Sequence, residues 1–174
     1  MIVFDTSFLA LAFDKKAAAP TDPSTKLPLA KSKERIDYLL QGLSDAKQRV
    51  LIPTPVLAEY LVNAGQDKDV RLQEFTTSKV FLVAAFDLRA AVECAMIEDG
   101  NSQNGKKLSP VESKAKVKFD RQIIAIAIAR GAKTIYTGDN GLAACARENH
   151  LNVVMTWEVP LPPEKPQLEL GYAE

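Results

Sequence analysis

Short segments of strand-like composition alternate with longer segments of helical periodicity along this chain, and this alternation constrains the fold more than any other feature. The short segments are residues 2–4, 50–52, 80–83, 134–137 and 153–155, each suited in length to a buried strand and too short for a helix. Strands that alternate with helices pair in parallel, and the helices then cover both faces of the sheet. We therefore predict a three-layer α/β/α sandwich with a central, mainly parallel five-stranded sheet.

The segments between these strands carry residues that begin and end helices. We predict that Thr6 or Ser7 caps the first helix. The longest predicted helix begins with a capping box formed by Ser109 and Glu112, runs to Arg130 and ends at Gly131. The other predicted helices cover residues 8–13, 33–43, 56–63, 88–98 and 142–149, with Ser32, Thr54 and Asp87 as caps of the second, third and fourth.

The chain has 174 residues, of which 47% are apolar, enough for one compact core. We expect a single domain over residues 1–157 and an extended, proline-rich tail over residues 158–174. The segments 14–31 and 99–113 are longer than the connections of a compact α/β domain usually are. The first of them is an exposed connection, long enough to be functional or mobile.

Composition excludes several classes of protein. The 22 basic and 22 acidic residues cancel, so a phosphate-binding surface must be local rather than spread over the whole molecule. Two cysteines are too few for a disulfide framework or a thiolate zinc site. The start of the chain has no signal-peptide pattern, and no apolar stretch approaches the roughly 20 residues that cross a bilayer. We expect a cytoplasmic protein with no membrane partner.

Four acidic residues lie where a ligand site is expected. Ligands of open α/β sheets bind outside the carboxyl ends of the strands. Asp5 directly follows the first predicted strand, and Asp139 lies two residues beyond the fourth. Asp120 falls within the apolar arc of its predicted helix, and Glu59 lies among apolar residues of another, which predicts burial of both. Because buried carboxylates are rare unless they are paired or bind a metal, we expect these four to hold Mg²⁺ or Mn²⁺, which prefer oxygen ligands.

Each of these acids also has an ordinary structural interpretation. Asp5 can cap a helix, Asp139 can form an Asx turn, and Asp120 can pair with Lys116, four residues earlier. A salt bridge is equally an ordinary role for Glu59. The functional interpretation rests on their convergence, since clustered carboxylates repel one another unless a proton or a divalent cation relieves them.

The residues around these acids resemble the four acidic motifs of PIN-domain ribonucleases, a family that includes VapC-like toxins. The resemblance spans residues 1 to about 156, nearly the whole chain. Each motif is short, but their order and spacing together are fairly specific. The motifs are Asp5-Thr6-Ser7, Pro-Thr-Pro-Val-Leu-Ala-Glu59, Lys-Phe-Asp120-Arg-Gln-Ile-Ile-Ala-Ile-Ala and Tyr-Thr137-Gly-Asp139.

This resemblance implies a five-stranded parallel sheet between helices and metal-dependent endonucleolytic cleavage of RNA. It also implies a homodimer and a small protein antitoxin whose peptide covers the acidic pocket. The segments 14–31 and 99–113 exceed the compact toxin pattern and leave the toxin subtype open. The implied catalytic and metal-binding residues are Asp5, Glu59, Asp120 and Asp139, with Thr6, Ser7 and Thr137 as polar neighbours, for which helix capping is an equally good role.

The expected mechanism is attack on phosphorus by a metal-activated water. Lys116, Lys118 and Arg121 belong to a basic stretch around Asp120. They can contact the RNA backbone, where cations position phosphates without reading sequence, or simply form a solvated helix face.

Two other classes of function remain open at this stage. A PIN-like domain that has lost its activity can serve as an interaction module. An aspartate that ends an N-terminal strand can also be the nucleophile of a phosphatase. The second aspartate expected two residues later in such an enzyme is Ser7 here, which weakens the phosphatase hypothesis.

Overall fold

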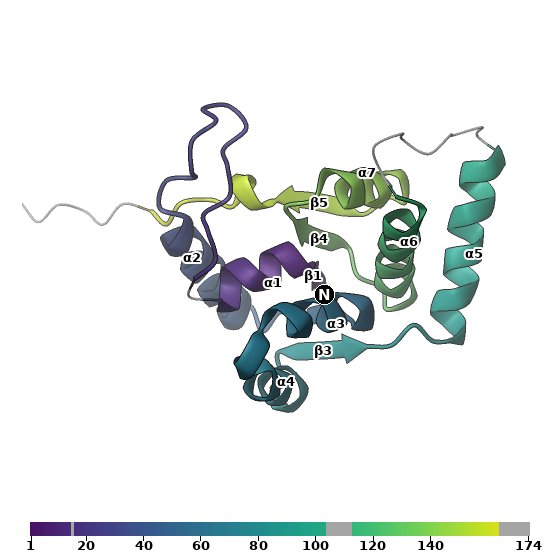
Figure 1. Cartoon of the computed structure of the whole chain (residues 1–174), viewed down its shortest axis with the longest axis horizontal. Helices are drawn as coiled ribbons and strands as arrows, with labels where there is room; N and C mark the ends of the chain where they lie inside the picture. The colour runs from purple at the N-terminus through teal and green to yellow at the C-terminus, as the bar shows by residue number, and fades with distance from the viewer. Residues whose placement is uncertain (15, 104–112, 164–174) are drawn as a thin grey trace, which may run out of the picture.

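The computed structural model describes residues 1–14, 16–103 and 113–163. Its centre is a sheet of five parallel strands in the order β3-β2-β1-β4-β5 (Figure 1). This confirms the predicted α/β class and the parallel sheet. The strands are β1 (Ile2–Phe4), β2 (Val50–Pro53), β3 (Phe81–Ala84), β4 (Thr134–Thr137) and β5 (Asn152–Met155).

The strand order reverses at β1. The chain moves outward from β1 to β2 and β3, and then returns to β4 on the other side of β1. Ile2 is paired with Val50 of β2 on one side and with Thr134 of β4 on the other. Right-handed crossovers that run in opposite directions across a sheet place their helices on opposite faces, which yields the three-layer arrangement. The carboxyl ends of β1 and β4 mark the switch point where ligands of such sheets bind.

The helices bury apolar side chains against this sheet. The segment Ile123 to Ala127 of α6 is buried on every side, because α6 lies between the sheet and α5, which runs along it in Figure 1. Gly131, with φ +70°, ends the helix as predicted. The helices are α1 (Thr6–Phe13), α2 (Ser32–Asp45), α3 (Thr54–Asn63), α4 (Lys68–Thr77), α5 (Leu88–Gln103), α6 (Lys114–Ala129) and α7 (Asn140–Glu148), with 3₁₀ turns η1 (Gly65–Asp67) and η2 (Thr156–Glu158).

Several helix starts differ from the prediction. The cap of α1 is Asp5 rather than Thr6 or Ser7, and α2 begins after Lys31 without a side-chain cap. Ser113 caps α6 by accepting from a backbone N–H, whereas the predicted capping box at 109–112 lies outside the described residues. Helix α4 was not predicted, because Phe75 is its one buried residue and a single apolar anchor leaves little periodicity to detect.

The long segment after α1 packs beside the end of the described chain. An antiparallel bridge joins Thr21 to Pro28, and the segment lies near η2 (Figure 1). Val159, just after η2, is fully buried, and its carbonyl accepts a hydrogen bond from Arg35 of α2. The core therefore extends through Val159. Within the described ranges, every helix is too short or too polar to span a bilayer.

Candidate active site at the carboxyl ends of β1 and β4

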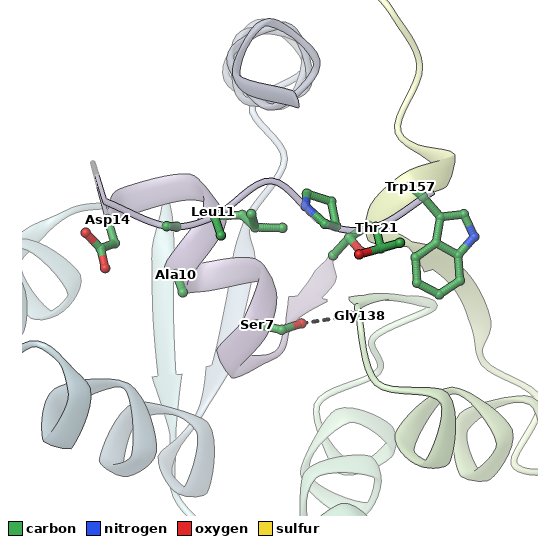
Figure 2. Close-up of a pocket in the computed structure, with 11 residues that line it drawn as sticks. Ser7, Ala10, Leu11, Asp14, Thr21, Gly138 and Trp157 are labelled. Atoms are coloured by element: carbon green, nitrogen blue, oxygen red, sulfur yellow. Dashed lines mark hydrogen bonds between the residues drawn. The ribbon is translucent and has the colours of Figure 1, made fainter. Parts of the chain in front are cut away.

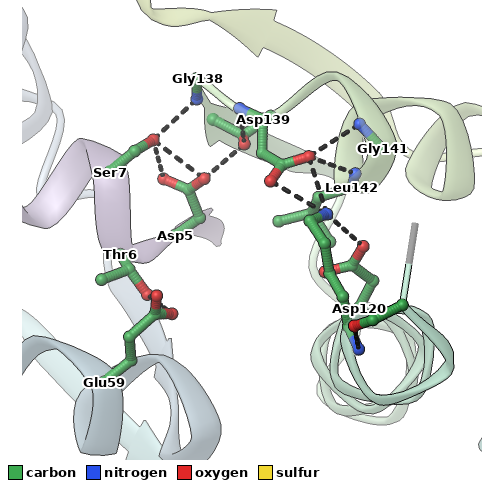
Figure 3. A network of polar contacts seen from close by, with 12 residues as sticks. Asp5, Thr6, Ser7, Glu59, Asp120, Gly138, Asp139, Gly141 and Leu142 are labelled. Carbon is green, nitrogen blue, oxygen red and sulfur yellow. Dashed lines mark hydrogen bonds and ion pairs between the residues drawn. The ribbon is translucent and has the colours of Figure 1, made fainter. Parts of the chain in front are cut away.

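Asp5 lies at the switch point of the sheet and is the most buried of the four predicted acids, with 3% of its surface exposed. As the cap of α1, its Oδ1 accepts the Phe8 N–H at 2.7 Å. The Ser7 hydroxyl donates to the same oxygen at 2.8 Å, and the Thr137 hydroxyl donates to Oδ2 (Figure 3). Loss of hydration raises the pKa of Asp5 to about 6, although these hydrogen bonds act to lower it. The charge of Asp139 adds to the increase. A cation beside Asp5 would lower the cost of its charge.

Two hydrogen-bonded links join Asp5 to the turn after β4. The Thr137 hydroxyl donates to Asp5 and accepts the Asp139 N–H at 2.9 Å. The Ser7 hydroxyl donates to Asp5 and accepts the Gly138 N–H at 2.8 Å. The predicted polar neighbours Ser7 and Thr137 therefore hold the ends of β1 and β4 in a defined relative position.

Asp139 begins α7, where its Oδ1 accepts the N–H groups of Gly141 at 2.7 Å and Leu142 at 3.0 Å. Partial burial disfavours its charge, but the hydrogen bond from Leu142 and the neighbouring Lys116 ammonium outweigh this and lower the pKa of Asp139. Asp139 is therefore ionised over the physiological pH range.

Lys116 lies between two of the predicted acids. Its Nζ is 3.0 Å from Asp120 Oδ2 and 3.0 Å from Asp139 Oδ2. Asp120 is 9% exposed, so its predicted burial is confirmed. The predicted pairing of Lys116 with Asp120 is present. Lys116 also pairs with Asp139, which follows it by 23 positions in the sequence. A single ammonium thus neutralises part of the charge of two carboxylates.

The other two predicted RNA-contact residues lie elsewhere on α6. Lys118 is exposed to solvent. Arg121 forms an ion pair with Glu98 of α5 at 2.9 Å, so its guanidinium stabilises the contact between the two helices.

The predicted burial of Glu59 is wrong. Glu59 is exposed, as is Val62 on the same helix, because only one side of α3 packs against the core. The Thr6 hydroxyl donates to Glu59 Oε2 at 2.6 Å. This pair lies to one side of Asp5, and Asp120 lies to the other (Figure 3). Thr6 thus orients Glu59 instead of capping α1.

The donor chemistry of the acids fits a divalent cation, although their present arrangement is not that of a metal site. No group of three acidic, histidine or cysteine residues within the described ranges is arranged to hold a metal. Asp120 and Asp139 nevertheless share one cation, the Lys116 ammonium, and carboxylate oxygens are the ligands that Mg²⁺ and Mn²⁺ prefer. Asp5, Asp120 and Asp139 are the residues whose carboxylates could supply such ligands, with Lys116 in competition for two of them.

A cavity beside this site involves residues that the sequence did not single out. Thr156 and Trp157 of η2 line it, and Trp157 lies across it from α1 (Figure 2). Ser7 and Gly138, which are joined by a hydrogen bond in the acidic network, line it as well. The unusual length of the segment 14–31, which also lines the cavity, was the one signal in the sequence that pointed here.

A scan against protein-family models and a search of curated proteins find no match to this chain. Solved structures do match it. FitAcB from Neisseria gonorrhoeae aligns with a TM-score of 0.56 and 22% identity, over 90% of this chain and 99% of that one. VapBC2 from Rickettsia felis, bound to a DNA fragment from its promoter, aligns with a TM-score of 0.55 and 18% identity, over 89% and 98%. DNA-bound VapBC from Salmonella typhimurium aligns at 0.52 and 14%, over 89% and 97%. The chain therefore has the PIN-like α/β fold that its motifs predicted.

Proposed function

We propose that this protein is a Mg²⁺- or Mn²⁺-dependent endoribonuclease that hydrolyses phosphodiester bonds of RNA. The observation that supports the proposal is a chain of contacts at the switch point of the sheet: Thr137 links Asp5 to Asp139, and the Lys116 ammonium links Asp139 to Asp120. A shared fold alone would not support an activity. The match between the acidic motifs and this geometry does.

The residues of this chain have separate roles in the proposal. Asp5, Asp120 and Asp139 bind the ion, with Glu59 as a further ligand or an outer hydrogen-bond acceptor. When bound, such an ion supplies Lewis-acid activation of water and offsets negative charge on the phosphate. Thr137 keeps the Asp5 carboxylate directed towards Asp139. In this proposal Lys116 leaves the acids when the ion binds, and Lys116 and Lys118 then contact the RNA backbone.

We further propose that the protein is the toxin of a toxin–antitoxin pair and acts as a homodimer. The resemblance to VapC-like toxins and the likeness to FitAcB and VapBC structures support this. A small antitoxin would place a peptide over the acidic pocket. The reading frame beside the gene is the first place to look for it.

A catalytically inactive interaction module is the second candidate, and one observation favours it. The Lys116 ammonium lies between Asp120 and Asp139 and offsets part of their charge, as would be expected if these acids only stabilised the fold. The phosphatase hypothesis is less well supported, since both oxygens of the buried Asp5 carboxylate accept hydrogen bonds and would have to be freed for nucleophilic attack.

RNA cleavage with and without metal tests the proposal. The wild type is expected to cleave RNA in Mn²⁺ but not in EDTA, and Asp120→Asn to reduce the rate by at least about 100-fold, since removal of one preorganised charged group commonly costs this much. Asp37→Asn is the matched control, because Asp37 is exposed on α2 and pairs only with Lys33 among the ion pairs of the described residues. A folded wild type that neither cleaves RNA nor gains thermal stability from Mn²⁺ would reject the nuclease in favour of the interaction module.

A further inference from the structure

A cavity of about 490 Å³ opens directly beside the acidic network, between α1, the segment 16–31 and η2 (Figure 2). Its volume lies within the range of small-molecule sites, about 300–1,000 Å³. Ser7 and Gly138 belong to both features: they line the cavity, and the Ser7 hydroxyl donates to Asp5. A group bound in the cavity would therefore lie next to whatever binds at the acids.

The cavity has a carboxylate in its lining, that of Asp14 (Figure 2), and its remaining walls suit a flat ring with polar edges. Leu11, Pro20 and the half-buried indole of Trp157 supply apolar surface, and Thr21 contributes a hydroxyl at the Trp157 end (Figure 2). None of the described residues that line the cavity is a lysine or arginine. It is therefore poorly suited to a phosphate group, which needs cations or N–H donors.

One polar atom at the cavity has no partner. Thr156 is 2% exposed, and its Oγ1 makes no hydrogen bond. A buried hydroxyl without a hydrogen bond costs free energy, and buried polar atoms in folded proteins almost always have a partner. The Thr156 hydroxyl oxygen is enclosed beside Gly138, so a ring in the cavity would meet the other atoms of Thr156 that line the wall.

We propose that this cavity binds a nucleobase of the RNA substrate, stacked on Trp157, beside the phosphate that the acids engage. The inference rests on the proposed nuclease function and specifies its substrate site. Nucleobases have apolar faces and hydrogen-bonding edges, and base stacking on aromatic side chains is a general mode of single-strand binding. The cavity thereby determines where along the strand the protein cuts.

Trp157 is the only tryptophan in the chain, so tryptophan fluorescence reports on this cavity alone. The wild type in EDTA, which prevents the proposed cleavage, is titrated with each of the four 5′-nucleoside monophosphates and with ribose 5-phosphate, which lacks a base. We expect saturable quenching by nucleotides and little by ribose 5-phosphate. Equal effects of both probes, or no quenching by any nucleotide, would overturn the proposal and leave a peptide side chain as the better occupant.

Ala10→Leu provides a second test that does not depend on truncating a packed residue. Ala10 lines the cavity from α1, and a leucine there fills space that a base would need while it retains helix propensity. We expect the apparent Kd for nucleotides to rise about tenfold or more, as stacking losses of this size are common. Ala95→Leu on the exposed surface of α5 is the matched control.

Cleavage assays separate the two proposals. RNA cleavage that Asp120→Asn abolishes but Ala10→Leu leaves at the wild-type kcat/KM would reject the base site and retain the nuclease. If the wild type did not cleave RNA, but nucleotides quenched its fluorescence and Ala10→Leu weakened this quenching, the nucleotide site would be retained and the nuclease rejected.

Discussion

Asp5→Asn tests whether the buried carboxylate is electrostatically costly when no metal is bound. Burial raises the pKa of Asp5 from the ordinary value of 3.8 to about 6. Each unit of pKa corresponds to about 1.36 kcal/mol, so ionising Asp5 in the folded protein costs about 3 kcal/mol more than in the unfolded chain. Asn removes the charge and preserves the shape of the side chain.

The sign of the pH dependence follows from linkage. Since the folded protein holds the Asp5 proton more tightly, the stability that this proton contributes is fully present below pH 3.8 and is lost as the pH rises through about 6. Asn does not titrate. The free energy of unfolding of the Asp5→Asn variant, minus that of the wild type, should therefore rise by up to about 3 kcal/mol between about pH 4 and pH 7 and then level off. One lost hydrogen bond, from Thr137 or Phe8, would lower this difference by a constant of about 1 kcal/mol.

The assay is urea denaturation of both proteins in EDTA at half-unit intervals from pH 4 to pH 8. Taking the difference between the two proteins cancels the titration of all other groups that they share. Asp37→Asn on α2 should show no such rise, because Asp37 is exposed. A difference that stays flat or falls with increasing pH would refute the inference that Asp5 is ionised at a cost.

Two further substitutions test the contacts around the acids. Lys116→Ala should lower metal-free stability by about 1–3 kcal/mol, because it removes an ammonium from the buried Asp120 carboxylate. It should also enlarge the rise in melting temperature caused by Mn²⁺, since no ammonium then competes with the ion. Lys118→Ala serves as its control. If Mn²⁺ raised the melting temperature of Lys116→Ala by no more than that of the wild type, the placement of the cation between the two acids would be contradicted. Gly138→Ala should destabilise the protein by about 1–3 kcal/mol, because the new Cβ would lie 3.0 Å from Ser7 Oγ, which hydrogen bonds hold in place. Urea denaturation at pH 7 measures this, and wild-type stability would show that the hydroxyl moves freely.

The sequence alone determined the class of fold and the place of three acids. Local patterns suffice for this, because a short apolar segment that ends at Asp5, or an apolar arc that contains Asp120, reflects backbone geometry over a few residues. The strands fell close to their predicted positions, and the burial of Asp120 followed from the spacing of its neighbours along α6. The resemblance of the motifs to those of PIN-domain proteins also implied the five-stranded parallel sheet between helices, whereas the order of its strands came only from the structure.

Only the tertiary structure determined which side chains are exposed and which segments that are distant in the sequence are in contact. Glu59 is exposed because it lies on the side of α3 that the described core does not cover, and the apolar composition of a short helix cannot reveal this. The contact of Lys116 with Asp139 joins α6 to the turn after β4, and the cavity under Trp157 requires three segments that are distant along the chain. Such contacts arise from long-range packing and electrostatics, whose energies depend on distances in space that residue spacing does not contain.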